Sequence, residues 1–352
     1  MSKMKIPTSM KAAVLWKTGE PLTVNDGIEI PKLKSGQVLI KMAFSGVCRS
    51  QLMEVMGLRG EDKYLPHLLG HEGCGQVIDK AKDVSKVSVG DWTILGWIKG
   101  EGKNAEGAKY KLDGTTINSG SVTTFSTYSV VSENRLVPLP SGIEKDIAVL
   151  FGCALPTGAG IVINEVKPKK DTSIGFVGMG GIGLSALMAC SAFNCKSVIS
   201  IDVSDAKLEL SKEFGATHTI NSSTTNVIKE VYEITNGEGL DYAIEAAGRV
   251  DTIELAFELV KRKGGNCVFA SHPEEGKKIR LDPFDLIAGK NIKGSWGGSS
   301  KPDKDVKVLA DLYNQGFMPL EKLITKTYSL EEINLALDDL KNSNVFRPLI
   351  VF

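Results

Sequence analysis

The chain has 352 residues, and its 42 Lys and Arg balance its 42 Asp and Glu, so its formal net charge is zero. A balanced charge gives no overall field that would draw the protein to nucleic acid or to an acidic membrane surface. The length fits two domains better than one. No apolar stretch approaches the ~18 residues that span a bilayer, and the N-terminus lacks the apolar core and cleavage site of a secretion signal. We therefore expect a soluble, cytoplasmic protein.

The first part of the chain, residues 10–150, contains short runs rich in β-branched and aromatic residues, such as GQVLIKMAFSG, EGCGQVID and FSTYSVV. Glycine and proline separate these runs, which predicts the strands of a compact β domain. The polar stretch from Gly100 to Gly120 is rich in glycine, lysine and asparagine, so we expect it to form a surface lobe or loop.

Three segments of this part carry candidate metal ligands: Cys48 in GVCRS, His71 in LGHEGCG and Cys153 in LFGCALPTG. Two thiolates and one imidazole, with a fourth position open, are the ligands of a catalytic zinc. The spacing alone does not assemble the three, because a cysteine is also a common buried apolar residue. Six cysteines without a secretion signal do not indicate a disulfide framework. We expect the remaining cysteines to be core residues and the remaining histidines to be structural or exposed: Cys74, Cys190, Cys195, Cys267, His67, His218 and His272.

From about Lys170, short apolar strands alternate with helical patterns. The strands are SIGFVG, SVISID, THTI, LDYAIEAA, NCVFA and NIKGSW, and the helices include LSALMACSAF, AKLELSKEFG, NVIKEVYEIT and TIELAFELVKRK. Alternation of this kind predicts a parallel sheet with helices on both faces, and six strands make a doubly wound, dinucleotide-binding sheet. Helices and a final strand, RPLIVF, follow.

The first of these strands runs into the turn GMGGIG, which holds a G-x-G-x-x-G pattern. Its glycines allow a tight turn, close approach of the backbone to a pyrophosphate, and close packing of helix on strand. The second strand ends in Asp202, whose carboxylate would accept hydrogen bonds from ribose hydroxyls and repel a 2′-phosphate. This favours NAD over NADP. We expect the cofactor-binding residues to be Gly178, Gly180, Gly181, Gly183, Asp202 and Lys207.

These motifs, taken in order along essentially the whole chain, resemble the zinc-containing medium-chain alcohol dehydrogenases. GHEGCGQVIDKAKDV is similar to the zinc signature of that family, and VCRS, GCALPTG, GMGGIG and NVFRPLIVF follow the same order. GSWGGSSKPDKDV and LITKTYSLEEIN most resemble the branch of aryl-alcohol and glutathione-dependent formaldehyde dehydrogenases. The resemblance implies an α/β chain with a GroES-like catalytic domain (1–154 and 297–352) and a Rossmann NAD-binding domain (155–296).

The resemblance also implies a role for each site residue. Cys48, His71 and Cys153 would bind zinc, and Glu72 would lie behind the metal. Ser50 would accept the alcohol proton. Arg49 and Arg347 would hold the pyrophosphate, and Thr157 would pack against the nicotinamide. Two aromatic residues, Trp97 and Tyr64, are expected to line the substrate pocket, although ordinary packing explains them equally well.

Three departures from the family pattern have chemical consequences. Residues 90–116 contain no cysteine or histidine, so the four-cysteine structural zinc site of some relatives cannot form there, and one catalytic zinc is expected. Gln51 stands where many relatives have an Asp that orients the zinc histidine. Met53 stands where relatives have the outer histidine of a proton relay, and a thioether cannot carry a proton.

The sequence therefore predicts a zinc-dependent alcohol dehydrogenase that transfers hydride reversibly between NAD and a primary or secondary alcohol, with an aromatic alcohol among the candidates. A polyol or sugar dehydrogenase with the same fold stays open. A zinc-free quinone or enone reductase, and an NAD-binding regulatory or structural protein with degraded catalysis, are the rival interpretations. The expected partners are a small-molecule alcohol or carbonyl and further copies of the chain, in a homodimer or homotetramer.

Overall fold

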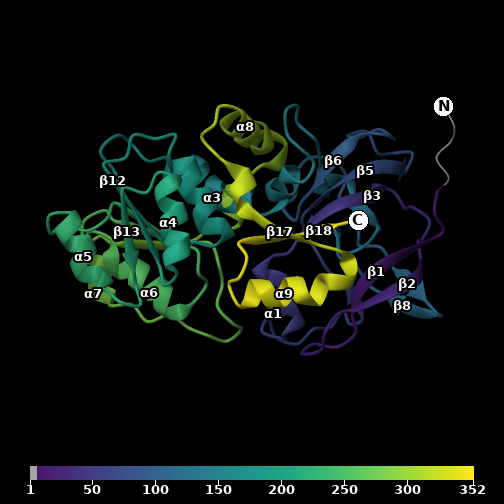
Figure 1. The fold of residues 1–352 in the computed structure, drawn as a ribbon, viewed down its shortest axis with the longest axis horizontal. Helices are drawn as coiled ribbons and strands as arrows, with labels where there is room; N and C mark the ends of the chain where they lie inside the picture. Colours follow the sequence, from purple (N-terminus) through teal and green to yellow (C-terminus); the bar gives the residue numbers. More distant parts are fainter. Residues whose placement is uncertain (1–5) are drawn as a thin grey trace. The chain divides into compact units, whose positions relative to one another are not determined.

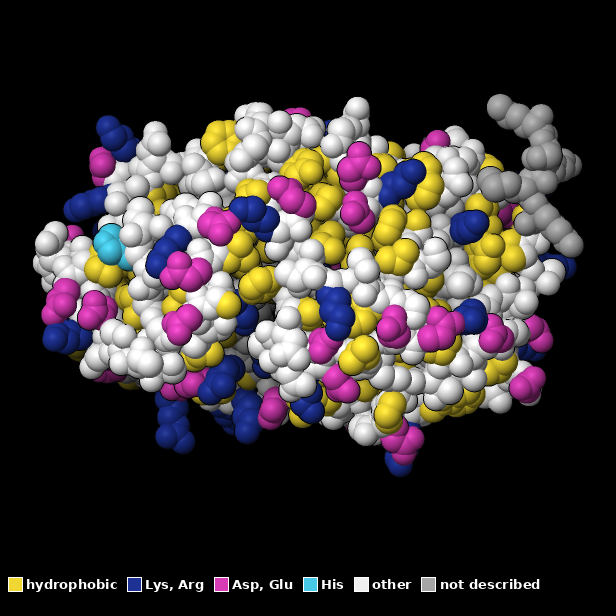
Figure 2. Space-filling view, in the orientation of Figure 1, with side chains coloured by type: hydrophobic (Ala, Val, Ile, Leu, Met, Phe, Trp, Pro, Cys, Tyr) yellow, Lys and Arg dark blue, Asp and Glu magenta, His cyan; other side chains and the backbone are white. Residues whose placement is uncertain are grey.

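The computed structural model describes residues 6–352, which divide into two compact units. The first unit comprises the chain up to Cys153 together with Lys301–Ala310 and Leu320–Phe352, and the second comprises Ala154–Ser300 and Asp311–Pro319. None of the helices within the described part of the chain has the length and apolar character needed to cross a bilayer. Basic and acidic side chains are interspersed on the face shown in Figure 2, as the zero net charge leads one to expect.

The first unit is built on two β-sheets (Figure 1). The smaller has the strand order β4 (His67–Leu68), β1 (Ser9–Leu15), β2 (Thr23–Glu29), β7 (Tyr110–Leu112) and β8 (Thr115–Ile117). The larger has the order β10 (Leu136–Pro138), β6 (Trp92–Leu95), β5 (Gly73–Lys80), β3 (Gln37–Gly46), β18 (Arg347–Val351) and β17 (Ile324–Tyr328), with β9 (Tyr128–Ser132) also paired to β3. Its helical elements include α1 (Arg49–Val55), η1 (Glu133–Arg135), η2 (Ile147–Gly152), η5 (Leu320–Leu323), η6 (Leu330–Glu332) and α9 (Ile333–Lys341).

The polar stretch from Gly100 to Gly120 is not only a surface loop, and this expectation was partly wrong. Within it, β7 and β8 form a hairpin that extends the smaller sheet beyond β2. Tyr110 and Ile117 are fully buried there, and the hydroxyl of Tyr110 accepts a hydrogen bond from the backbone N–H of Val130 at 2.8 Å. The segment packs because Tyr110 and Ile117 belong to a larger buried apolar cluster, against which Leu112 of the same hairpin also packs.

The beginning of the stretch from Gly100 to Gly120 is held by the buried carboxylate of Glu133. It accepts hydrogen bonds from the backbone N–H groups of Ser85, Lys86 and Lys103 at 2.7, 2.8 and 2.8 Å. These bonds outweigh the cost of burying the carboxylate, so the pKa of Glu133 lies below its ordinary value. One carboxylate thus fixes two loops that have few apolar side chains of their own.

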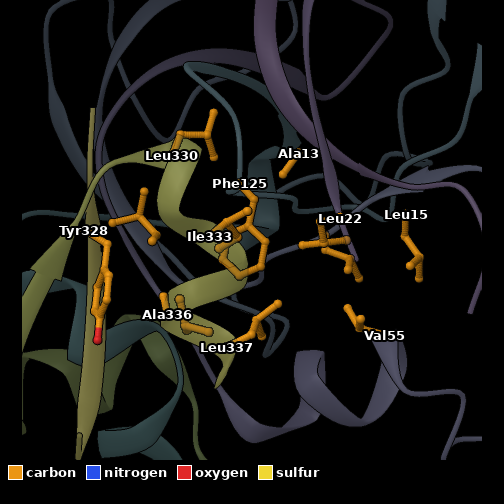
Figure 3. Close-up of a cluster of buried hydrophobic side chains, with 13 residues drawn as sticks. Ala13, Leu15, Leu22, Val55, Phe125, Tyr328, Leu330, Ile333, Ala336 and Leu337 are labelled. Atoms are coloured by element: carbon orange, nitrogen blue, oxygen red, sulfur yellow. The ribbon is translucent and has the colours of Figure 1, made fainter. Parts of the chain in front are cut away.

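The C-terminal segment completes the first unit through a buried apolar cluster. Figure 3 shows Ile333, Ala336 and Leu337 of α9 directed toward Phe125 and toward Val55 at the end of α1. This packing accompanies the pairing of β18 with β3, in which Leu349 lies opposite Gly46. The last strand of the chain therefore runs beside the strand that leads into Cys48.

The second unit is a six-stranded parallel sheet with the order β13 (His218–Asn221), β12 (Ser197–Asp202), β11 (Ser173–Val177), β14 (Tyr242–Glu245), β15 (Asn266–Phe269) and β16 (Asn291–Gly294). Its helices are α2 (Ala154–Gly160), which continues into the π-helix η3 (Ile161–Val166), then α3 (Gly181–Cys190), α4 (Asp205–Glu213), α5 (Val227–Ile234), α6 (Val250–Leu259) and α7 (Pro283–Ile287), with the short turn η4 (Gly297–Ser299). Helix α8 (Pro302–Asn314) contributes residues to both units. This strand order is that of a doubly wound dinucleotide fold, so the predicted six-stranded sheet is confirmed.

Candidate metal centre and nucleotide site

Two neighbouring strands bring the first three metal-binding candidates together. Ser45 of β3 pairs with Gly73 of β5, so the residues just after β3 and just before β5 are adjacent in space. Cys48 follows β3 as the N-cap of α1, and His71 precedes β5. The sheet register therefore places a thiol beside an imidazole although the residues are far apart in the sequence.

Cys153 reaches the same point from η2, and a glycine permits this. A Cβ atom at Gly152 would lie 2.3 Å from the carbonyl oxygen of Leu95 and 3.0 Å from the Cβ of Glu72. A residue with a side chain would have to push η2 away from the sheet, and Cys153 would move with it. The structure therefore requires glycine before the third ligand.

The ligand atoms of Cys48, His71, Glu72 and Cys153 lie within 4.8 Å of one another. The Nε2 atom of His71 is 3.2 Å from the Sγ atom of Cys153. Glu72 is fully buried, yet neither of its carboxylate oxygens has a hydrogen-bond partner. Two thiols, an imidazole and a buried carboxylate that accepts no hydrogen bond form the donor set that zinc prefers, so the residues fit the metal that the sequence predicts.

The electrostatics of the cluster favour a thiolate at Cys48 but not at Cys153, because the hydrogen bond between the two raises the pKa of Cys153. The thiol of Cys153, which is hydrogen-bonded to Cys48, holds the pKa of Cys48 well below its ordinary value, with help from His71 and Arg347. Burial raises the pKa of Glu72 to about 7, and the guanidinium of Arg347, whose Nη1 lies 3.2 Å from Oε1 of Glu72, opposes this rise. Metal ligands must bind in their deprotonated forms, and one thiolate is already preferred here.

Helix α1 supplies the residues that surround the cluster from one side. The side-chain oxygen of Gln51 accepts a hydrogen bond from the backbone N–H of Cys48 at 3.0 Å, and its amide nitrogen lies against Nδ1 of His71. Gln51 is thus the residue that orients the imidazole. Ser50 has a buried hydroxyl without a partner, and Met53 is a buried side chain in the same helix.

The structure places the remaining candidates of the first unit as follows. Arg347 is only 4% exposed and pairs with Glu72. Sequence reasoning did not predict this contact with the metal centre. Arg49 is exposed at the start of α1. Trp97 is partly buried, and its backbone carbonyl accepts a hydrogen bond from Arg135. Tyr64 is 72% exposed. The pyrophosphate and pocket roles of these residues stay predictions.

In the second unit, the glycine turn has the geometry that its pattern predicts. Gly178 has φ of 91°, and a Cβ at Gly183 would lie 2.0 Å from the carbonyl oxygen of Gly178, so helix and strand pack too closely for any side chain. Gly180 is the N-cap of α3, and a Cβ placed there would meet nothing within 4 Å. The space above Gly180 and the free N–H groups that begin with Gly181 suit a phosphate.

The other nucleotide candidates lie on neighbouring elements of this unit. Asp202 ends β12, and its carboxylate accepts hydrogen bonds from the backbone N–H groups of Met179 and Ser204 at 2.6 and 3.0 Å. Thr157 is buried in α2 with a hydroxyl that has no partner. Lys207 is partly exposed in the first turn of α4. Asp202 thus lies against the glycine turn, as its predicted role requires.

One buried acid at this site was missed. Glu245 ends the central strand β14, and its Oε1 accepts hydrogen bonds from the backbone N–H groups of Ala247 and Gly248 and from the hydroxyl of Thr252, at 2.8, 2.7 and 2.7 Å. Burial raises its pKa. The signal was an acidic residue at the end of the apolar run LDYAIE, followed by AAG. Glu245 fixes the loop that packs against Gly178.

Comparison with known proteins agrees with both parts of the site. Residues 34–141 match the alcohol dehydrogenase GroES-like domain, and residues 181–315 match the zinc-binding dehydrogenase family. An S-(hydroxymethyl)glutathione dehydrogenase of Komagataella pastoris is 29% identical, over 97% of each chain. The benzyl alcohol dehydrogenase structure from Acinetobacter calcoaceticus is 29% identical with a TM-score of 0.88, over 98% of this chain and 99% of that one. The 2R,3R-butanediol dehydrogenase structure from Bacillus subtilis is 25% identical with a TM-score of 0.79, over 98% and 100%.

A GroES-like β domain that carries a zinc-ligand cluster, joined to a Rossmann sheet with a dinucleotide turn, defines a zinc-dependent dehydrogenase. The chain belongs to the zinc-containing medium-chain alcohol dehydrogenases, and the predicted fold class, family and enzyme class are confirmed.

Proposed function

We propose that this alcohol dehydrogenase catalyses reversible hydride transfer between an aromatic primary alcohol and NAD, with one zinc ion per chain. The observation that carries the proposal is the convergence of Cys48, His71 and Cys153 beside the buried carboxylate of Glu72. When bound, zinc acts as a Lewis acid that lowers the pKa of an alcohol toward neutrality. A bound nicotinamide would supply the hydride acceptor, and the protein supplies orientation and electrostatics.

Residues of the first unit would bind the metal, contact its imidazole ligand and accept the proton of the alcohol. Cys48, His71 and Cys153 would hold the metal, and the side-chain amide of Gln51 lies against Nδ1 of His71. The hydroxyl of Ser50 is buried and free of hydrogen bonds, so its Oγ is available to accept the proton of the alcohol. Beyond Ser50, the side chain of Met53 cannot carry the proton further. A bound nicotinamide ribose, together with water, would have to provide the onward path for the proton.

The proposal includes a single zinc. Among the described residues, only the cluster around Cys48 combines thiol and imidazole groups. A second group, formed by Glu54, Asp62 and His67, has no thiol, and both ring nitrogens of His67 are already engaged. Nε2 lies 2.7 Å from Asp62 and Nδ1 lies 3.0 Å from the carbonyl oxygen of Leu68. The lack of cysteine in residues 90–116 supports the same stoichiometry.

The preference for NAD rests on Asp202 at the end of β12, because a carboxylate there disfavours a 2′-phosphate. The aromatic alcohol is supported by the likeness to a benzyl alcohol dehydrogenase. A polyol or diol substrate is the second candidate, since a butanediol dehydrogenase has the same fold. We also propose that the protein works as a homodimer or homotetramer whose only other partner is the small-molecule substrate.

The test is a turnover assay with NAD or NADP and a panel of benzyl alcohol, aliphatic alcohols, polyols and S-(hydroxymethyl)glutathione. We expect the highest kcat/KM with benzyl alcohol and NAD, and one zinc per chain by elemental analysis. Cys48→Ala and His71→Ala should abolish turnover while NAD binding survives. Cys74→Ala, a buried cysteine of the same sheet, is the matched control and should keep turnover. Activity retained without Cys48, or two zinc ions per chain, would contradict the proposal. No turnover with any alcohol would favour a degraded, regulatory protein.

A further inference from the structure

A second pair of cysteines lies in the second unit, outside the metal centre. Helix α3 ends at Cys190, and β12 begins at Ser197 after a short turn. Cys190 is fully buried, whereas Cys195 is partly exposed between the exposed residues Asn194 and Lys196. The expectation that Cys195 belongs to the core was therefore wrong.

The turn between them holds the two sulfur atoms in contact. The Sγ atoms of Cys190 and Cys195 are 3.6 Å apart, and both thiols are free. Backbone hydrogen bonds of 2.9 Å run from Phe193 N–H to the carbonyl of Cys190 and from Cys195 N–H to the carbonyl of Phe193. A disulfide has an S–S length near 2.05 Å, so the sulfurs need to approach by roughly 1.5 Å. The hydrogen bonds of the turn already hold the two sulfurs at 3.6 Å.

The two sulfurs differ in reactivity. The thiol of Cys190 is hydrogen-bonded to Cys195 and lowers the pKa of Cys195, against the opposing effects of burial and of the nearby carboxylate of Asp241. Part of the charge of Asp241 is offset by its ion pair with Lys261. The pKa of Cys190 is raised by the same hydrogen bond and by burial. The more exposed cysteine is thus the one whose pKa is lowered, and the thiolate is the nucleophile in thiol oxidation.

We propose that Cys195 and Cys190 form a peroxide-sensitive thiol pair, which closes to a reversible disulfide at the C-terminal end of α3. The thiolate of Cys195 attacks one oxygen of hydrogen peroxide, which gives a sulfenic acid and, after protonation, one water. The thiol of Cys190 then attacks the sulfenic sulfur, loses its proton and releases a second water. Two thiols are oxidised to one disulfide, and one peroxide is reduced to two waters.

The other cysteines of the chain are poorly placed to compete. Cys74 and Cys267 are buried, and burial raises the pKa of each to about 12. Cys48 and Cys153 lie in the metal centre and are engaged when the metal is bound. In the zinc-loaded enzyme, Cys195 is therefore expected to be the first thiol to react, and its neighbour prevents further oxidation.

The experiment uses the zinc-loaded enzyme, a stoichiometric amount of hydrogen peroxide, alkylation of the remaining free thiols, and peptide mapping by mass spectrometry. We expect the single peptide that contains both Cys190 and Cys195 to be lighter by two hydrogen atoms, to resist alkylation at both positions, and to revert with dithiothreitol. In Cys190→Ser, a dimedone adduct should accumulate on Cys195. In Cys195→Ser, Cys190 should stay reduced. Cys267→Ser is the matched control and should form the disulfide at the wild-type rate.

Three results would overturn the proposal. One is full alkylation of Cys195 after peroxide treatment of the wild type, and another is a sulfinic acid on Cys195 with Cys190 still reduced. The third is oxidation of Cys190 in Cys195→Ser at the rate seen in the wild type. If a serine variant fails to fold, the peptide map of the peroxide-treated wild type still decides whether the disulfide forms. Since the readout is the oxidation state of two thiols that are not zinc ligands, neither failure nor success depends on the proposed alcohol substrate.

Discussion

Replacing Gln51 with glutamate tests how the metal-binding imidazole is held. The single side-chain oxygen of Gln51 is taken by the backbone N–H of Cys48, and its NH₂ group faces Nδ1 of His71. A neutral imidazole that binds a metal through Nε2 carries its proton on Nδ1 and needs an acceptor there. Rotating the amide to offer its oxygen to His71 would set its NH₂ group against the N–H of Cys48. Gln51 can therefore satisfy only one of the two donors.

Gln51→Glu has the same length and two acceptor oxygens, one for each donor. We expect it to bind zinc about 10–100-fold more tightly than the wild type, which is the range by which hydrogen-bond partners of zinc ligands change metal affinity. That factor corresponds to about 1.4–2.8 kcal/mol, the size of one hydrogen bond to a charged group. A second carboxylate near Glu72 adds to the attraction for a cation in the same direction.

The assay is a competition for zinc against a chelator of known affinity, at fixed pH, with the thermal stability of the metal-free proteins measured alongside. Gln315→Glu makes the same charge change at an exposed position of the second unit, and its zinc affinity should equal that of the wild type. Zinc affinity that is unchanged or lower in Gln51→Glu, in a variant that folds normally, would refute this account of the hydrogen bonds around His71.

Three further predictions concern the turn, a buried carboxylate and the proton path. Gly180→Ala should keep the melting temperature of the wild type and weaken NAD binding at least tenfold, whereas Gly183→Ala should lower both stability and NAD binding, as seen by calorimetry and titration. Glu133→Gln should cost about 1–3 kcal/mol of unfolding free energy at pH 7. Because the folded pKa of Glu133 is lowered, this difference should shrink as the pH falls through that pKa, below 4.5; denaturant titrations at several pH values measure it. Ser50→Ala should reduce kcat about 10²–10⁴-fold, and Met53→Ala should have a much smaller effect; equal losses would contradict the assigned path.

The parallel sheet could be predicted from the sequence because each of its elements is one uninterrupted run. A strand such as SVISID and the glycine turn before α3 carry their own signals, and the sheet assembles them in an order that their alternation with helices predicts. The two short strands β7 and β8 gave no such signal. Tyr110 and Ile117 are isolated among polar residues, and only their pairing partners in the smaller sheet make the segment a hairpin.

The metal centre could be predicted only through the resemblance to a family. His71 and Cys153 are 82 positions apart, and no local period relates them. The contact between Arg347 and Glu72 escaped even the resemblance, since it depends on the pairing of the last strand with β3. Cys195 was misassigned because its partial exposure follows from a turn whose geometry the apolar pattern around Cys190 does not encode.

The two departures in α1 have a common consequence for the charge of the metal centre. An acid at the position of Gln51 and a base at that of Met53 would surround the cluster with titratable groups, but the helix offers an amide and a thioether instead. The charges that remain nearby are the carboxylate of Glu72 and the guanidinium of Arg347, which are buried and paired. With both thiols deprotonated, a divalent cation makes the buried set neutral, since two thiolates and one carboxylate offset one guanidinium and two metal charges. Neutrality limits the cost of burying the ions. Gln51, as a neutral amide, would also lead His71 to donate less electron density to the metal than a carboxylate at this position would. The residue that weakens zinc binding would therefore make a bound zinc a stronger Lewis acid.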